Sequence, residues 1–320
     1  MNNEIYKIKR ILILVALSFL ASCGKDEQEP NKWENISSFT IEGKSFSSIA
    51  VLNGKLLALE SNTSKKNNLY QSIDNGTTWD VVLQTPYQFC TIATFGNTIY
   101  CGTNTIPAHG IFRSEDNGDT WIPTNSGLPL GPSNFFEFSD KLIADATMYV
   151  IYGKDLYSFN NGTWVSVTNS IDAAVSTFTV NGTQLFVRTS GGIFGSQNGS
   201  SNWSIVDPQF KYATAMVQIG SNLIAGNSSG LFFSSNGSGF TKAVINNQTF
   251  SPWVNCIIKD KLNVYAGTQG GRGVFVSSDN GATWTSFNEG FSDIPSVWDI
   301  TENNGILYVA TNHGIWKRKL

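Results

Sequence analysis

Four carboxylates stand on or beside segments expected to line the centre of the fold, and their type suits catalysis. They are Glu60, Glu137, Asp145 and Asp299. Glycoside hydrolysis needs two carboxyl groups within about 10 Å of each other, one as the acid and the other as base or nucleophile. Asp299 and Glu60 would fall on adjacent units of a closed ring, so they are the pair that such chemistry would use. The alternative is that each carboxylate is solvated or satisfied by its own neighbours.

Aromatic residues suited to ligand binding gather before the expected inner strands. The set comprises Tyr87, Phe89, Phe135, Phe136, Phe210, Tyr212, Phe250, Trp253, Phe291 and Trp298. Together such rings could form a rim on which sugars or an apolar segment stack, although any single ring is more often core packing. The individual residues that we take as ligand-binding candidates are Tyr87, Trp253, Phe291, Trp298, His109, Arg272 and His313.

The remaining reactive side chains favour neither a metal site nor a cofactor. His109 and His313 are the only histidines and fall in separate repeats, and no Cys/His cluster has the spacing of a zinc site. Cys90 and Cys101 lie on consecutive strands, but the turn between them would set them diagonally, which suits a disulfide poorly. We therefore expect thiols that pack as small hydrophobic residues, and no metal or cofactor.

A repeated turn marks the elements that must position these residues. The segment Ser72-Ile73-Asp74-Asn75-Gly76-Thr77-Thr78-Trp79 recurs at 114–121 and at 277–284, and we call these three segments the Ser–Asp turns. Degenerate copies end at Trp164, Trp203 and Phe240. Successive terminal aromatics are roughly forty residues apart, which is the spacing of a four-stranded propeller blade.

The composition of each Ser–Asp turn predicts that it stabilises the hairpin between a third and a fourth strand. Ser and Asp side chains can bond backbone groups, Asn-Gly supplies positive φ angles, and Trp fills the gap toward the neighbouring sheet. One carboxylate per turn offers too few oxygen ligands for calcium. The residues that we assign to this structural role are Ser72, Asp74, Gly76, Trp79, Ser114, Asp116, Gly118, Trp121, Ser277, Asp279, Gly281 and Trp284.

The Ser–Asp turns resemble the Asp-box, or BNR repeat, of sialidase-like β-propellers. In that family the turns lie on the face opposite the substrate site, so the resemblance implies a scaffold role. Sialidases also use three arginines and an early Arg-Ile-Pro type motif. The arginines after residue 22 are Arg113, Arg188, Arg272 and Arg318, and Thr105-Ile106-Pro107 lacks the arginine of the early motif. A sialic-acid carboxylate would lack its fork of guanidinium donors, so we do not expect sialidase activity.

Seven copies of a third strand, most of them Gly-aliphatic-aromatic, set the number of blades. Their aliphatic-aromatic pairs are Leu69-Tyr70, Ile111-Phe112, Leu156-Tyr157, Ile193-Phe194, Leu231-Phe232, Val274-Phe275 and Ile315-Trp316. Short strands between turn signals, without a helical period, predict an all-β, seven-bladed β-propeller of four-stranded antiparallel blades. The seventh copy stops at Leu320 without a fourth strand. We predict that the strand around Trp33 pairs with the one around Ile315 and closes the ring.

The first residues are typical of a targeting sequence rather than of part of the folded domain. Residues 1–22 have basic residues before an apolar run too short to span a bilayer, which is typical of a signal peptide. Leu20-Ala21-Ser22-Cys23 resembles a bacterial lipobox, which implies a lipid on Cys23. Residues 23–31 are polar and predict a flexible tether, which leaves 32–320 as the propeller. The residues after Cys23 also resemble the signal that sends Gram-negative lipoproteins to the cell surface, so we expect an outer-membrane location.

Charge and architecture then narrow the function. The formal net charge is −3 and there is no basic run, so nucleic acid is not an expected partner. The size and blade count are similar to those of the photosystem assembly factor group, single propellers that bind a partner protein, but their arginine-rich patch is missing. The sequence favours a non-catalytic, monomeric propeller that binds a glycan or a protein through the loops opposite the Ser–Asp turns and meets the membrane only through its lipid. A hydrolase or lyase of extracellular polysaccharide, or a scaffold in an outer-membrane assembly, are the alternatives.

Overall fold

The computed structural model describes ten segments of the chain. They are residues 31–37, 41–61, 68–84, 89–103, 110–129, 143–144, 147–182, 184–197, 202–246 and 251–320. One compact unit extends from Trp33 to Leu320. Cys23 and the rest of the predicted signal and tether up to Pro30 lie outside the described residues, as do Tyr87, His109, Glu137 and Asp145.

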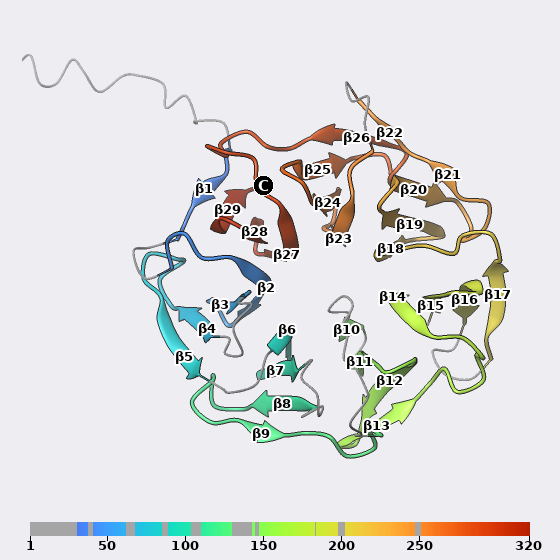
Figure 1. The fold of residues 1–320 in the computed structure, drawn as a ribbon, viewed down its shortest axis with the longest axis horizontal. Coiled ribbons are helices and arrows are strands. Elements are labelled where there is room, and N and C mark those ends of the chain that lie inside the picture. Colours follow the sequence, from blue (N-terminus) through green and yellow to red (C-terminus); the bar gives the residue numbers. More distant parts are fainter. Residues whose placement is uncertain are drawn as a thin grey trace, which may run out of the picture. The chain divides into compact units, whose positions relative to one another are not determined.

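The unit is a ring of seven four-stranded antiparallel blades, which confirms the predicted fold class (Figure 1). From the centre outward, blade 1 consists of β2 (Phe46–Leu52), β3 (Lys55–Glu60), β4 (Asn68–Ser72) and β5 (Asp80–Gln84). Blade 2 consists of β6 (Phe89–Phe95), β7 (Thr98–Thr103), β8 (Ile111–Ser114) and β9 (Ile122–Pro123). Blade 3 consists of β10 (Ile143–Ala144), β11 (Thr147–Tyr152), β12 (Asp155–Asn160) and β13 (Thr163–Ser166). Blade 4 consists of β14 (Val175–Asn181), β15 (Gln184–Thr189), β16 (Gly192–Ser196) and β17 (Ser204–Asp207). Blade 5 consists of β18 (Ala215–Ile219), β19 (Asn222–Asn227), β20 (Gly230–Ser234) and β21 (Thr241–Lys242). Blade 6 consists of β23 (Val254–Lys259), β24 (Val264–Thr268), β25 (Gly273–Ser277) and β26 (Thr283–Ser286). Blade 7 consists of β27 (Val297–Asn303), β28 (Ile306–Thr311), β29 (Gly314–Lys319) and the N-terminal strand β1 (Glu34–Asn35).

Blade 6 departs from the expected plan by carrying a fifth strand. The segment β22 (Val244–Ile245), which leads out of blade 5, runs parallel to β26 with Val244 opposite Thr283. Two further backbone hydrogen bonds extend this pairing, from Val244 N to Ala282 O and from Asn246 N to Trp284 O. The connection therefore covers backbone groups that the outer edge of blade 6 would otherwise leave open.

The second strand of each blade is buried on both faces because a neighbouring blade covers each face. In β3 every residue after Lys55 is buried, and all five residues of β24 are buried. Strands of this kind show no alternation of apolar and polar residues, since neither face meets water. The hydrophobic core is thus divided among the seams between blades.

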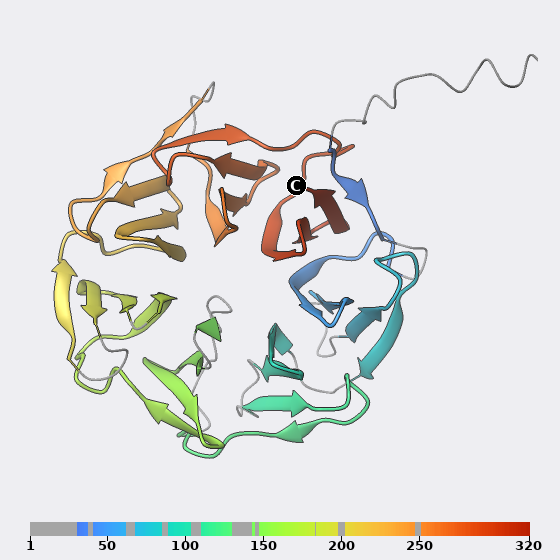
Figure 2. The ribbon, with the colours of Figure 1, turned by 180° about the vertical axis from the view of Figure 1, so that it is seen from behind.

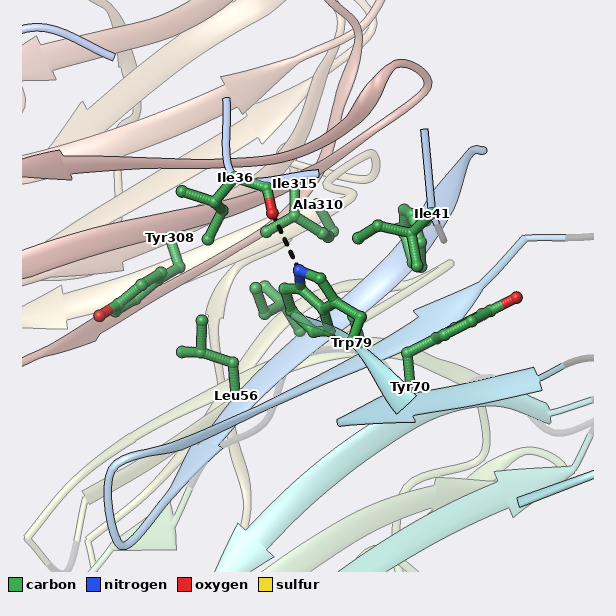
Figure 3. Close-up of a cluster of buried hydrophobic side chains, with 11 residues drawn as sticks. Ile36, Ile41, Leu56, Tyr70, Trp79, Tyr308, Ala310 and Ile315 are labelled. Carbon is green, nitrogen blue, oxygen red and sulfur yellow. Dashed lines mark hydrogen bonds between the residues drawn. The ribbon is translucent and has the colours of Figure 1, made fainter. Parts of the chain in front are cut away.

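The seam between blades 1 and 7 shows how these cores form (Figure 3). The Trp79 side chain follows the first Ser–Asp turn and packs with Leu56 and Tyr70 of its own blade and with Tyr308 of blade 7. Its indole Nε1 donates a 2.9 Å hydrogen bond to the Ile36 carbonyl of the closing segment. The Ser–Asp turn therefore joins two blades as well as two strands.

The N-terminal strand closes the ring, as predicted. Strand β1 pairs antiparallel with β29, with Glu34 opposite Lys317 and Asn35 opposite Trp316. The blue strand lies beside the red C-terminal strands in both views (Figures 1 and 2). Trp33 extends the closure to blade 6, because its backbone N donates to Glu289 O and its Nε1 donates to Phe287 O at 2.6 Å.

The three described cysteines are thiols. In the pairing of β6 with β7, Cys101 lies opposite Ile92, so Cys90 and Cys101 do not face each other. Cys101 and Cys256 are buried among aliphatic residues of two different seams. The antiparallel register sets the two neighbouring thiols diagonally, as the sequence predicts, and this geometry suits a disulfide poorly.

We expect Trp33→Ala to destabilise the protein by roughly 3–5 kcal/mol, because truncating a buried aromatic leaves a cavity. Trp33 is only 2% exposed and stacks on the Phe291 ring at 5.0 Å. The measurement is urea-induced unfolding followed by tryptophan fluorescence and circular dichroism. Trp253→Ala is the matched control, because Trp253 is 50% exposed and its loss should change stability by less than about 0.5 kcal/mol. Equal effects of the two substitutions would contradict the closure.

Candidate functional site

The three Ser–Asp turns share one closed hydrogen-bond arrangement. Ser72 Oγ donates to Asp74 Oδ1 at 2.8 Å and accepts from Gly76 N at 2.8 Å. Asp74 also accepts from the backbone N of Thr78 at 2.9 Å and from its hydroxyl at 2.7 Å. Asn75 and Gly76 have φ angles of 57° and 91°, which glycine adopts freely and asparagine tolerates. The turns at 114–121 and 277–284 repeat this pattern.

These hydrogen bonds hold the aspartate carboxylates within their own turns. The backbone N–H of Thr78, together with its hydroxyl, lowers the pKa of Asp74 to about 2. Hydrogen bonds from Thr120 lower the pKa of Asp116 to about 2 in the same way. Each carboxylate is thus fixed by donors from its own turn. Among the residues that the structure describes, no three His, Cys, Asp or Glu side chains come together in a way that could hold a metal ion.

The glycine of each complete turn packs against the preceding blade. A Cβ on Gly76 would lie 2.6 Å from Ile36, and one on Gly281 would lie 2.7 Å from Ile224. A side chain at Gly76 or Gly281 would push the two blades apart, whereas a Cβ on Gly118 would lie 3.6 Å from Val82, an ordinary contact. The turn residues therefore serve the seams.

Asp299, the leading catalytic candidate, ties blade 7 to blade 1. Its Oδ2 accepts a 2.9 Å hydrogen bond from Ser48 Oγ and a 2.8 Å bond from Ile49 N. Ser48 Oγ in turn accepts from Ile92 N of blade 2 at 3.3 Å. One carboxylate and one hydroxyl thus connect the inner strands of three successive blades.

Glu60, the proposed partner of Asp299, is buried within blade 1. It accepts hydrogen bonds from Lys44 Nζ at 2.9 Å, from Asn68 Nδ2 at 2.7 Å and from Tyr70 OH at 3.3 Å. The hydrogen bond with Glu60 raises the pKa of Lys44. Glu60 and Asp299 therefore bond to different structural partners, and these contacts account for both carboxylates without a shared catalytic role.

The loops opposite the Ser–Asp turns, which we call the loop face, present two large exposed aromatics. Tyr212 lies before β18 and is 73% exposed, and Trp253 lies before β23 and is 50% exposed. Arg188 stands over the Tyr212 ring at 5.6 Å and donates hydrogen bonds to Ser176 Oγ and to Lys211 O. Tyr212 was in the aromatic set that the sequence indicated, but its pairing with Arg188 was not foreseen, since the two residues meet only where blades 4 and 5 adjoin.

Phe291, by contrast, is part of the ring closure. Its ring stacks on Trp33 at 5.0 Å and meets the Trp316 ring edge-on at 5.0 Å. Phe210 packs in a similar way against Phe240, with the ring centroids 4.3 Å apart. Packing accounts for both rings.

The loop-face end of the inner strands carries a repeated β-bulge that the sequence did not reveal. In five blades the register between first and second strand shifts at the same place, and the bulged residues are Ser47, Cys90, Ser176, Asn255 and Trp298. Bulges re-aim side chains at the rims of closed sheets. Four of these residues are small or polar, so blade 7 alone among the five places an indole here, that of Trp298.

The cationic candidates form no compact site within the described segments. His313 Nδ1 lies 3.9 Å from Asp293 Oδ2, and its other ring nitrogen lies 3.3 Å from Asn312 Nδ2. Arg272 is exposed in the loop after β24, and its backbone O accepts from Asn288 Nδ2 at 2.9 Å. Both residues belong to the polar rim of blades 6 and 7.

Comparison with known proteins gives the fold. No protein-family model and no curated protein matches the sequence. Among solved structures, YCF48 from Cyanidioschyzon merolae aligns with a TM-score of 0.63 at 13% identity, over 90% of this chain and 98% of that one. YCF48 bound to D1 peptide aligns with a TM-score of 0.64 at 14% identity, over 91% and 98%.

Two larger bacterial proteins are also similar in structure. The extracellular domain of BT4673 from B. thetaiotaomicron aligns with a TM-score of 0.65 at 12% identity, over 90% of this chain and 40% of that one. PorZ, a surface component of the type-IX secretion system of Porphyromonas gingivalis, aligns with a TM-score of 0.60 at 14% identity, over 86% and 46%. The chain thus spans less than half of these two proteins. At such identities the likeness establishes a seven-bladed propeller.

Within the described segments, the structure contains no helix whose length and apolar character would let it cross a membrane.

We expect the double variant Asp74→Asn/Asp116→Asn to make the free energy of unfolding depend less on pH at acid pH than it does in the wild type. Because folding lowers both pKa values to about 2 from the usual 3.8, the two carboxylates stabilise the fold above about pH 4. That stabilisation disappears as the pH falls from about 4 to 2. Urea midpoints measured from pH 2 to pH 7 would show it, with Asp119→Asn, in the same turn as Asp116, as the control. A variant profile parallel to that of the wild type would contradict this assignment.

Proposed function

We propose that this protein is a propeller that binds a partner protein through its loop face. The observation that carries the proposal is the pair of exposed aromatics, Tyr212 and Trp253, which precede the inner strands of adjacent blades. Large exposed rings of this kind are the residues that most often anchor interfaces. Arg188, bonded to Ser176 and Lys211, adds a fixed cation beside Tyr212. An extended segment with aromatic and acidic side chains is the partner that suits this surface.

The structural neighbours support a protein ligand over a glycan. YCF48 is a single propeller of nearly the same extent, and one of its structures is described as bound to D1 peptide. PorZ is described as a bacterial surface component. These likenesses are of fold, so the ligand is assigned here from the exposed side chains. A role as a scaffold within an outer-membrane assembly is a form of the same proposal, in which the partner is a membrane component.

The glycan and enzyme alternatives differ in what they require of the site. A glycan would stack on the same two rings, so Tyr212 and Trp253 serve either ligand. A glycoside hydrolase would need two carboxylates facing one another across a bound sugar. Asp299 and Glu60 bond to Ser48 and Lys44 respectively, which favours a structural role for both.

We further propose that the propeller is held at the outer face of the outer membrane by a lipid on Cys23. In this proposal residues 1–22 are removed as a signal peptide and residues 23–31 form the tether. The propeller body then extends from residue 32 to 320 and acts as a monomer. The three Ser–Asp turns would be Asp-boxes of the sialidase-like type, since their residues match that repeat.

The binding proposal is tested by photo-crosslinking at two exposed positions of the full-length protein in intact cells. A photo-reactive amino acid in place of Trp253 should capture a protein. The same residue in place of Leu262, which is 84% exposed in the turn between β23 and β24 on the other face, should not. Affinity for the captured protein, once purified, should fall at least about tenfold in Tyr212→Ala and stay unchanged in Leu262→Ala.

Two outcomes would replace this proposal. Glycan-array signals that disappear in Trp253→Ala, with no captured protein, would make the ligand a glycan. Sugar release from any of those glycans that is lost in Asp299→Asn would make the protein an enzyme. Capture that is the same at positions 253 and 262 would remove the loop face as the interface.

The anchoring proposal predicts that Cys23→Ser moves the protein from the membrane to the soluble fraction. The physical reason is that acyl chains on one residue supply the whole membrane affinity. Fractionation and labelling with a palmitate analogue measure this, and Cys90→Ser, which changes a thiol inside blade 2, is the control. Membrane association that persists without Cys23 would contradict the anchor.

A further inference from the structure

A pocket lies in the seam between blades 4 and 5, on the face that carries the Ser–Asp turns. Its volume is about 410 Å³. It is bordered by Gln184 at the start of β15, by Ser221 before β19, by Gln197 and Asn202 between β16 and β17, and by Asn236 after β20. This pocket is separate from the loop face, because first-to-second and third-to-fourth strand turns share one end of a blade while the aromatics described above occupy the other.

The lining of the pocket is rich in amides and carries no charge. Three glutamines, two asparagines and two serines contribute to it, together with Phe186, Val206 and a glycine. A charged ligand would find no counter-ion among these residues. Hydroxyl groups, which both donate and accept, are the natural complement of carboxamides and serines.

A directed row of hydrogen bonds holds the glutamines in place. Gln218 Nε2 donates to Gln184 Oε1 at 2.6 Å and to Gly220 O at 3.0 Å, and Gln184 Nε2 donates to Gln197 Oε1 at 2.9 Å. Since a backbone carbonyl only accepts, Gly220 fixes the orientation of the Gln218 amide, and the other two follow from it. The exposed end of the row therefore presents the Nε2 donor of Gln197.

The buried end of the row holds an acceptor with almost no exposed surface. Gln218 is only 1% exposed, and no donor among the described residues reaches its Oε1. A buried acceptor without a donor costs free energy, which a site can recover when a ligand or a water supplies the hydrogen bond. Beside this row, Phe186 and Val206 give an apolar surface of the kind on which the C–H face of a sugar ring packs.

The pocket lies in a seam to which blade 5 contributes Asn236, from a turn that departs from the pattern of the repeat. In blades 1, 3 and 4 the indole of the turn donates to a carbonyl of the preceding blade, that of Ile36, Thr124 and Val167 respectively. In blades 2 and 6 the indole donates to the glycine carbonyl of its own turn. Blade 5 has Phe240 at this position, which lacks an N–H. Its seam is held instead by Asp207 Oδ2, which accepts from Gly239 N at 2.8 Å. The seam is therefore secured by a different bond.

We propose that this pocket is a binding site for a neutral saccharide, independent of the partner-binding loop face. Fixed amide donors and acceptors, the uncharged lining and the apolar side at Phe186 together match a hydroxyl-rich ring without ionised groups. A second copy of such a site is not expected at blades 1 or 6, since their complete turns place an aspartate and a tryptophan there.

The test measures saccharide binding to the full-length protein in a detergent that has no sugar headgroup. Saturation-transfer NMR and calorimetry would compare neutral hexoses, N-acetylglucosamine and their disaccharides with glucuronic acid and glucosamine. We expect a neutral saccharide to bind, and its affinity to fall at least about tenfold in Gln184→Leu, which breaks the row of amides. Ser204→Trp, which fills the pocket from the exposed strand β17, should abolish binding.

Matched controls separate a lost site from a lost fold. Asn222→Leu changes the residue of β19 that corresponds to Gln184. Thr285→Trp adds the same indole to β26 in blade 6, directly after the tryptophan of the repeat, which is also the position of Ser204 in its own blade. Both controls should bind as the wild type does, and all four variants should keep cooperative thermal unfolding. The pocket variants should also retain the loop-face partner, while Trp253→Ala should retain the saccharide.

Three results would overturn the proposal. The first is the absence of binding by any neutral saccharide at millimolar concentration, and the second is a preference for the charged sugars. The third is binding that survives both Gln184→Leu and Ser204→Trp, or that is lost in Trp253→Ala, since the sugar would then sit elsewhere.

Discussion

The fold depends on contact between neighbouring blades, because no blade has an outer layer of its own. Strands such as β3 and β24 are buried on both faces, so each sheet must be covered on two sides by others of the same kind. Only a closed ring provides two neighbours for every sheet. Asp299, the leading catalytic candidate, serves this requirement by bonding one inner strand to the next.

The repeat was enough to predict the architecture, because its information is local. A turn that locks a hairpin every forty residues or so can be recognised in any one copy, and the aromatic at Trp33 was recognisable as the missing end of the last copy. The site was harder to foresee. The contacts of Asp299 with Ser48, and of Arg188 with Tyr212, join residues that no local pattern relates.

The repeated turn was predicted as scaffold, and the proposed saccharide site would give the seam between two of its degenerate copies a second role. Where the tryptophan is present, its indole fills the seam. In blade 5, where Phe240 replaces it, Asp207 secures the seam, and a pocket lies beside it on the face of the turns. Sequence comparison of the copies could flag the departure, but the pocket itself exists only once two blades are set side by side.

The closing strand has a consequence for how the molecule can be made. Trp33 Nε1 bonds to Phe287 O across 254 residues, and Ser37 bonds to Ile315 across 278, so the last blade combines the two ends of the unit. Contacts of such sequence separation form late, after a large loss of chain entropy. The ring cannot complete its final sheet until β29 is available. A chain exported in the unfolded state would therefore remain open throughout its passage and acquire its full stability only on arrival.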